Sequence, residues 1–272
     1  MNLCFLLLFL SPFAQSQPPS CDRCIAVYGD TRKGHEVHRR LAERILAFKP
    51  SLVFHTGDMV GKGSSAKDWA YFNEISSGLR ASAEFFPVHG NHEDHAPLYY
   101  QNFGIDPEKI WYSVDRLGIH FIVLDSESPL WEDTYQRGWL DQDIAATDAR
   151  FIVVLLHRPV YATGPHGAND TKVLAPMLAP LFKKHGVSAV FSGHDHAYER
   201  SEADGIPYVV TGGGGAPLYK QRKASAATSK VFIPAHHFVS VSVKPEGLLC
   251  EVFGEDGALI DSFTAKPRAP RP

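Results

Sequence analysis

Apolar runs of strand length alternate with segments of helical periodicity along most of the chain. Apolar side chains recur at helical spacing over residues 35–48, which predicts a helix there. Similar patterns predict helices over residues 69–79, 135–146 and 173–184, the last interrupted by Pro176 and Pro180. The apolar runs between them predict strands at residues 25–28, 52–54, 85–89, 111–114, 120–124, 151–156 and 187–191.

Short strands separated by turns replace this alternation towards the carboxyl terminus. Strands are predicted at residues 208–211, 238–243, 248–253 and 259–263. Strands joined first by helices and then by tight turns favour one α/β domain with two packed mixed sheets. We place this single domain at residues 24–265, because no linker divides it. The tail over residues 266–272 alternates Pro and Arg, and we expect it to be disordered.

The amino terminus has the pattern of a secretory signal peptide. Residues 3–10 form an apolar run, which is shorter than the about 20 residues that span a bilayer. Small residues follow at Ala14 and Ser16. We therefore predict a signal peptide over residues 1–16, a short tail over residues 17–23, and a secreted or periplasmic protein with no membrane span. A buried first strand or a short anchor is the alternative interpretation of the run.

The net charge bears on the partners that the protein can bind, and the cysteines bear on its disulfide bonds. The 272 residues include 27 Lys and Arg against 30 Asp and Glu, for a net charge of -3, without a basic block. We therefore expect no nucleic acid as a stable partner. Export permits disulfides, and two bridges stay open at this point: Cys24 with Cys250, or Cys21 with Cys24.

Five of the predicted strands run directly into Asp, Asn or His residues. The candidate site residues at these strand ends are Asp30, Asp58, Asn91, His92, His157, His194 and His196. In open α/β sheets, ligands bind outside the carboxyl ends of the strands. A glycine precedes four of these segments, which permits sharp turns and close backbone approach. We therefore expect these side chains to converge on one site.

The donor atoms of this set indicate a metal centre. It offers carboxylates, one amide oxygen and imidazoles but no thiolate, which suits Zn, Mn or Fe. The set is too large for one tetrahedral ion. Two divalent or trivalent ions about 3.5–4 Å apart would use all of it, and such pairs clamp the attacking and leaving oxygens of a displacement. This predicts hydrolysis of a small-molecule phosphoester substrate.

The same residues resemble the ordered blocks of the calcineurin-like metallophosphoesterases, with features of the purple-acid-phosphatase branch. The matching blocks are Gly29-Asp30, Gly57-Asp58, Gly90-Asn91-His92-Glu93, His157 and Gly193-His194-Asp195-His196. The resemblance covers residues 25–263 and implies a four-layer αββα sandwich of two mixed sheets flanked by helices.

The resemblance also implies roles for these residues. Asp30 and His196 would hold the first ion. The second ion would be held by Asn91, His157 and His194. Asp58 would bridge the two ions, and His92 would face the phosphoryl group as an acid or a transition-state stabiliser.

The activity implied is that of an exported phosphomonoesterase of the acid-phosphatase type, working by in-line attack of a metal-bound hydroxide. A phosphodiesterase acting on nucleotides or glycerophosphodiesters is the alternative within the enzyme class. A non-catalytic, metal-stabilised binding module is the alternative outside it.

Two positions depart from the family's pattern at the first ion. Arg32 stands where the family has a His ligand, and Gly61 stands where purple acid phosphatases have a Tyr. Water could fill the gap, or His35 or His38 could fold back towards it. We favour a third reading, in which Arg32 is catalytic and binds phosphate oxygens bidentately. A further expectation is that His237 lines the substrate pocket.

Overall fold

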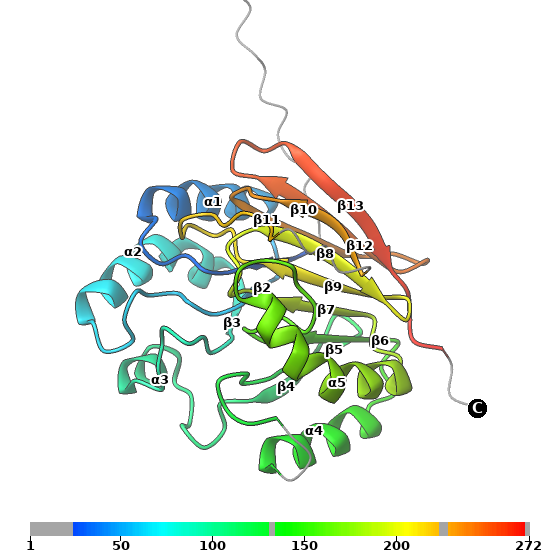
Figure 1. The fold of residues 1–272 in the computed structure, drawn as a ribbon. Helices are drawn as coiled ribbons and strands as arrows, with labels where there is room; N and C mark the ends of the chain where they lie inside the picture. The colour runs from blue at the N-terminus through cyan, green and yellow to red at the C-terminus, as the bar shows by residue number, and fades with distance from the viewer. Residues whose placement is uncertain (1–23, 131–133, 223–227, 270–272) are drawn as a thin grey trace, which may run out of the picture.

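Two mixed β-sheets face each other in the computed structural model of the protein, which describes residues 24–130, 134–222 and 228–269 (Figure 1). The six-stranded sheet has the order β13-β12-β11-β1-β2-β3. Its strands are β1 (Cys24–Tyr28), β2 (Leu52–His55), β3 (Glu84–Pro87), β11 (His237–Val243), β12 (Leu248–Gly254) and β13 (Leu259–Ala265). β1, β2 and β3 are parallel, so their carboxyl ends share one edge.

The seven-stranded sheet has the order β10-β8-β9-β7-β6-β5-β4. Its strands are β4 (Tyr112–Arg116), β5 (Ile119–Val123), β6 (Phe151–Leu155), β7 (Ala189–Ser192), β8 (Tyr198–Ala203), β9 (Ile206–Thr211) and β10 (Ser229–Ile233). β5, β6 and β7 are parallel. The carboxyl ends of β6 and β7 therefore also lie at one edge.

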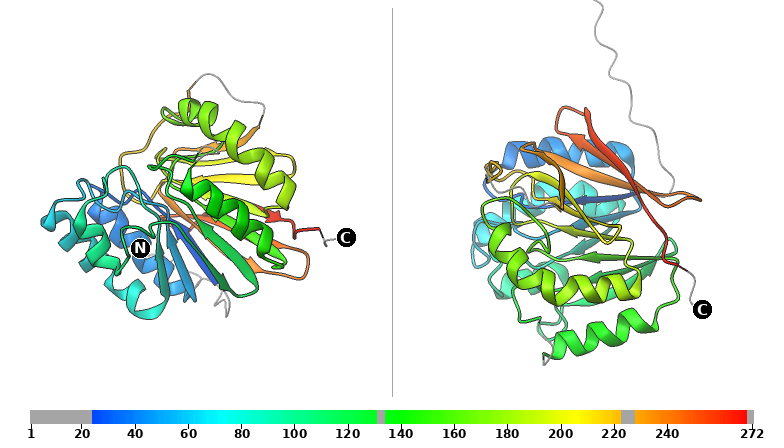
Figure 2. Two further views of the ribbon diagram at one scale, coloured as in Figure 1. Left: turned by 90° about the horizontal axis from the view of Figure 1, so that it is seen from below. Right: turned by 45° about the vertical axis from the view of Figure 1, so that its right-hand side comes forward.

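Helices cover the outer face of each sheet (Figure 2). The helices are α1 (His35–Phe48), α2 (Ala66–Ser82), α3 (Pro97–Phe103), α4 (Tyr135–Ala146) and α5 (Gly167–His185). α1 and α2 pack on the six-stranded sheet, whereas α4 and α5 pack on the seven-stranded sheet. The prediction of a four-layer αββα sandwich in a single domain is therefore confirmed.

Strands between these layers are apolar at successive positions, because both of their faces are covered. In β1, Ile25 and Val27 face the core between the sheets, whereas Ala26 and Tyr28 pack under the helices. A strand that is buried on both faces needs apolar residues at successive positions rather than at alternate ones. The inter-sheet core brings Phe54 against Phe121, with ring centroids 4.6 Å apart. This packing holds the two sheet edges together where the candidate site lies.

Three elements were not predicted, and one helix differs from its prediction. α3 has only seven residues and β10 has five, so each is too short to show a clear period, and β8 is rich in polar residues. α5 begins at Gly167 and runs without interruption through Pro176 and Pro180. Both prolines lie on the exposed face, where water can satisfy the carbonyls that lose their hydrogen bonds.

The ends of the chain bear on several predictions. The predicted signal peptide and the tail over residues 17–23 lie outside the described residues.

Cys24 is disulfide-bonded, whereas Cys250 is free and buried, so the alternative that joins these two residues is wrong. At the carboxyl end, the Arg268 backbone N–H donates to the Arg150 carbonyl oxygen at 2.9 Å, and residues 270–272 of the predicted tail lie outside the described residues. Within the described ranges, no helix is long and apolar enough to cross a membrane.

His120 in β5 lies away from the candidate site and makes the stability of the fold depend on pH. Its Nδ1 lies 2.8 Å from Asp115 Oδ1 and its Nε2 lies 2.9 Å from Asp143 Oδ2. Burial lowers the pKa of His120, but hydrogen bonds to Asp143 and Asp115 outweigh it, so the pKa is raised from 6.5. The stabilisation is therefore present below about pH 6.5 and is lost as the pH rises through the folded-state pKa.

We expect His120→Gln to lower the free energy of unfolding by on the order of 1 kcal/mol at pH 5.5 and by less at pH 9, as measured by urea denaturation. Ser113→Ala is the matched control, because the Ser113 hydroxyl donates to the same Asp143 carboxylate at 2.8 Å without carrying charge. Its effect should be equal at both pH values. An equal loss at both pH values for His120→Gln would contradict the charged pairing.

Candidate metal centre

The predicted site residues follow strands of both sheets and meet between the two sheet edges. Asp30, Asp58 and the Asn91–His92 segment follow β1, β2 and β3. His157 follows β6, and the segment 194–196 follows β7. Ligand-type atoms of Asp30, Asp58 and His157 all lie within 4.8 Å of one another. The expectation that these strand ends share one site agrees with this geometry.

Side-chain atoms that can bind a metal ion lie close together around the His157 ring. Its Nδ1 lies 2.8 Å from the Thr56 carbonyl oxygen, so Nδ1 carries a proton, and in the neutral tautomer Nε2 is an acceptor. This Nε2 lies 3.0 Å from Asn91 Oδ1, 3.2 Å from His194 Nδ1 and 3.4 Å from Asp58 Oδ1. When the proton of the His194 ring is on Nε2, all four atoms are acceptors, and they repel one another unless a cation lies among them. This group could hold one metal ion, and we call it the second position.

The other half of the centre is arranged differently. Asp30 Oδ1 lies 3.6 Å from His196 Nε2, and the two residues together with Asp58 form what we call the first position. Arg32 reaches into it: Nε donates to Asp58 Oδ2 at 3.2 Å, and Nη2 lies 3.3 Å from His196 Nε2. The Arg32 side chain is only 11% exposed. It therefore lies within the centre rather than in solvent.

Burial sets the charge states of the histidines. His196 donates from Nδ1 to the Pro217 carbonyl oxygen at 2.8 Å. Burial lowers the pKa of His196 to about 4 and holds that of His194 well below its usual range. Both rings are neutral near pH 7, which is the form of imidazole that coordinates metals. Burial also raises the pKa of Asp30, and the nearby Asp58 carboxylate raises it further, whereas the positive charge of Arg32 opposes this shift.

The backbone is strained where it presents these side chains. Asp30, Asp58 and His194 have φ values of 58°, 55° and 69°, in the left-handed region that non-glycine residues seldom adopt. Such conformations cost of order 1–3 kcal/mol each and gather at functional sites. Gly193 permits the close approach, because a Cβ there would lie 2.3 Å from Asp30 Oδ2.

His92 is placed to face a substrate. Its Nδ1 donates to the Gly61 carbonyl oxygen at 2.8 Å, and its Nε2 lies 3.8 Å from Asp58 Oδ2. The backbone N–H of His92 also donates to Asp58 Oδ1 at 3.0 Å. The side chain is 27% exposed, so Nε2 is open to solvent beside the centre.

Three predicted participants lie elsewhere. His237 is fully buried, with Nδ1 donating to the Ala235 carbonyl oxygen at 2.9 Å and its ring against Tyr198. It therefore does not line a pocket open to substrate. His38 is buried against Tyr28, and His35 stacks on Tyr71. Neither histidine folds back to complete the first position.

Several supporting residues were not assigned a role from the sequence. Glu93 accepts backbone N–H groups of Asp58 and Gly90, each at 2.9 Å, and so ties the loops after β2 and β3 together. Tyr219 stacks on His196 with ring centroids 4.1 Å apart. The block around residues 90–93 marks Glu93 in the sequence, but nothing near Tyr219 signals its contact, since it depends on a distant loop.

A second cluster of ligand-type residues lies beside the centre but is internally satisfied. His89 Nδ1 pairs with Asp125 Oδ1 at 3.0 Å, and His89 Nε2 accepts the backbone N–H of His95 at 3.0 Å. Both ring nitrogens of His89 are therefore used. The cluster supports the loop that carries Asn91 and His92 and offers no second metal site.

The fold and these strand-end residues define a metallophosphoesterase. The model of the calcineurin-like phosphoesterase family matches residues 25–198, more than half of the chain, and the protein belongs to this family. A purple acid phosphatase of Glycine max is 28% identical over 200 residues, covering 70% of this chain and 39% of that protein. The chain thus spans well under half the length of this relative.

Solved structures show the same fold. Purple acid phosphatase PPD1 from yellow lupin (Lupinus luteus) seeds has a TM-score of 0.81 at 19% identity, covering 91% of this chain and 54% of that chain. GAP50, the anchor in the inner membrane complex of Plasmodium, has a TM-score of 0.76 at 19% identity, covering 93% and 91%. The sandwich therefore resembles both a phosphatase and an anchor, and the site decides the function.

Proposed function

We propose that the protein is an exported, metal-dependent phosphomonoesterase of the purple-acid-phosphatase type. The observation that carries this proposal is the convergence of ligand-type atoms of Asp58, Asn91 and His194 on His157 Nε2, at 3.0 to 3.4 Å. These four residues would hold a metal ion. Membership of the family and the relative from Glycine max support hydrolysis as the use of that ion. Export rests on the amino-terminal sequence pattern.

A bound ion would polarise a phosphoryl oxygen and lower the pKa of coordinated water to about 7. The oxygen and nitrogen donors suit Zn, Mn or Fe. The sequence predicts two ions, and the four donors named above fit the second of the predicted positions. The first position contains Arg32.

Side chains of the centre would act on the substrate directly. In its imidazolium form, with the Nδ1 proton held by the Gly61 carbonyl oxygen, His92 would give its Nε2 proton to the leaving-group oxygen and become neutral. Arg32 contacts Asp58, His196 and Tyr219, and its remaining N–H groups are available for phosphate oxygens. A monoester carries one more negative charge than a diester, so this fixed cation favours the monoester.

A paired assay tests the proposal. Protein depleted of metal with a chelator and reloaded with Zn(II), Mn(II) or Fe(II) is given p-nitrophenyl phosphate and bis(p-nitrophenyl) phosphate. We expect metal-dependent hydrolysis with a higher kcat/KM on the monoester. A higher kcat/KM on the diester would assign a phosphodiesterase. A loaded protein that hydrolyses neither ester would support a non-catalytic, metal-stabilised binding module.

A further inference from the structure

We propose that the guanidinium of Arg32 takes the place of the first metal ion, so that the centre binds one ion tightly, at the second position. This inference refines the proposed function and rests on it. Its direct support is the pattern of hydrogen-bond donors and acceptors in the two halves of the centre.

At the first position, Arg32 already contacts two of the atoms that would bind an ion. Its Nε donates to Asp58 Oδ2 at 3.2 Å. Because His196 Nδ1 donates to Pro217, the acceptor of the neutral ring is Nε2, and Arg32 Nη2 lies 3.3 Å from it. A cation at this position would compete with a planar, permanently charged group that satisfies the same two atoms.

The charges of the buried groups also favour a centre without an ion at the first position. Asp30 and Asp58 are 0% and 1% exposed, and buried carboxylates are stable only when they are paired or coordinated. Arg32 supplies one permanent positive charge to this pair. An ion added at the first position would be repelled by the guanidinium unless Arg32 moved out.

The second position shows the opposite pattern. Ligand-type atoms of Asn91, His194 and Asp58 lie 3.0, 3.2 and 3.4 Å from His157 Nε2. The hydrogen bond from His157 Nδ1 to the Thr56 carbonyl oxygen lies on the other side of the ring. No guanidinium or ammonium group enters this half among the described contacts. One half of the centre therefore needs a cation, while the other half contains one.

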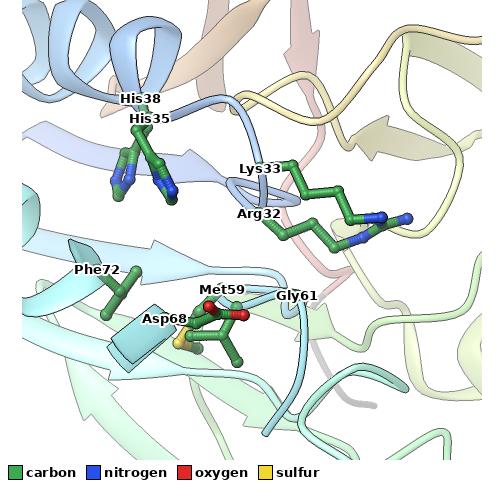
Figure 3. Close-up of a pocket in the computed structure, with 9 residues that line it drawn as sticks. Arg32, Lys33, His35, His38, Met59, Gly61, Asp68 and Phe72 are labelled. Carbon is green, nitrogen blue, oxygen red and sulfur yellow. The ribbon is translucent and has the colours of Figure 1, made fainter. Parts of the chain in front are cut away.

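The two residues that differ from the family's pattern lie close together in the structure. Arg32 and Gly61 line the same cavity, of about 60 Å³, together with His35, Asp68 and Phe72 (Figure 3). Gly61 has no side chain to fill this space, and the Cβ of any replacement would lie 3.0 Å from Asp68 Oδ2. The missing tyrosine leaves room beside the first position, and Arg32 occupies the position itself. Both differences therefore change the same half of the centre, the first position.

The backbone directs Arg32 inward. The Arg32 N–H donates to the Asp58 carbonyl oxygen at 3.3 Å, and the Ala216 N–H donates to the Asp30 carbonyl oxygen at 2.8 Å. A Cβ at Gly34 would lie 1.8 Å from the Gly215 carbonyl oxygen, so the segments around residues 34 and 215 are in direct contact. Tyr219, which stacks on His196, also contacts Arg32. The loop is therefore held on several sides in the geometry that presents Arg32.

The number of ions per chain tests this inference. Protein stripped with a chelator is titrated with Zn(II) by calorimetry, then dialysed against metal-free buffer and analysed by inductively coupled plasma mass spectrometry. We expect one Zn(II) per chain for the wild type. Arg32→His, which restores the family's ligand, should raise the number to two. Lys33→His is the matched control: it places a histidine one residue away, keeps Arg32, and should stay at one.

Two ions retained by the wild type would overturn the inference, and this measurement needs no variant to fold. A folded Arg32→His protein, checked by circular dichroism, that still retains one ion would also overturn it. Hydrolysis of p-nitrophenyl phosphate by the same samples separates the two proposals. Two ions with hydrolysis remove the inference and keep the proposed function, whereas one ion without hydrolysis removes the function and keeps the inference.

Discussion

Asp58→Asn is expected to abolish nearly all phosphatase activity and to release the metal ion. Asp58 lies between the two halves of the centre: Oδ1 faces His157 at 3.4 Å, and Oδ2 accepts from Arg32 at 3.2 Å. Asn has the same shape but no charge, so it would weaken the hold on the ion and leave Arg32 without its counter-charge. Loss of residues that only support metal ligands costs about 10–100-fold in affinity or activity. We therefore expect at least about a 100-fold loss for a direct donor.

The measurement combines kcat/KM on p-nitrophenyl phosphate with metal content after dialysis. Asp256→Asn is the matched control, because Asp256 is exposed in the turn between β12 and β13. It should retain both metal and activity. If Asp58→Asn kept wild-type activity and metal content, Asp58 would have no place in the centre.

His92→Ala is expected to separate catalysis from metal binding. The variant keeps the backbone N–H that donates to Asp58 at 3.0 Å, so the second position should be preserved. It removes Nε2, which we assign to protonating the leaving group. General acid catalysis typically contributes about 10²–10⁴-fold, and we expect kcat to fall by about that factor with one ion still bound.

A substrate series sharpens this test. Esters with good leaving groups, such as p-nitrophenol, need protonation less than alkyl phosphates do, so the loss in kcat should be larger for an alkyl phosphate. His185→Ala, at the opposite end of α5 from the centre, is the control and should leave both rates unchanged. An unchanged kcat on both esters would remove His92 from the mechanism. Loss of the metal ion would instead make His92 part of the second position.

The site residues could be predicted because local sequence and topology act together. In a parallel sheet the strand ends share one edge, so Asp30, Asp58 and Asn91 had to lie near one another once their strands were recognised. The helices over residues 35–48 and 135–146 were predicted with the bounds that α1 and α4 have. Continuous apolar strands likewise indicated layers on both sides of each sheet.

The remaining features depend on contacts between distant segments. The sequence marks Arg32 as a departure from a pattern, but its partner His196 lies 164 residues away and its hydrogen bonds follow only from the fold. His237 was expected near substrate because it is a histidine beside another histidine, yet the fold buries it under Tyr198. β8 is rich in polar residues that are satisfied by partners elsewhere, such as Arg200 by Asp261 at 2.8 Å. Its pattern therefore did not predict a strand.

The most direct test of the central claim is anomalous diffraction from a crystal of the protein soaked in Zn(II). The account predicts a strong peak within coordination distance of Asp58, Asn91, His157 and His194. Absence of a peak among these four residues, with zinc bound elsewhere on the chain, would contradict the assignment of the metal centre and the phosphatase function built on it.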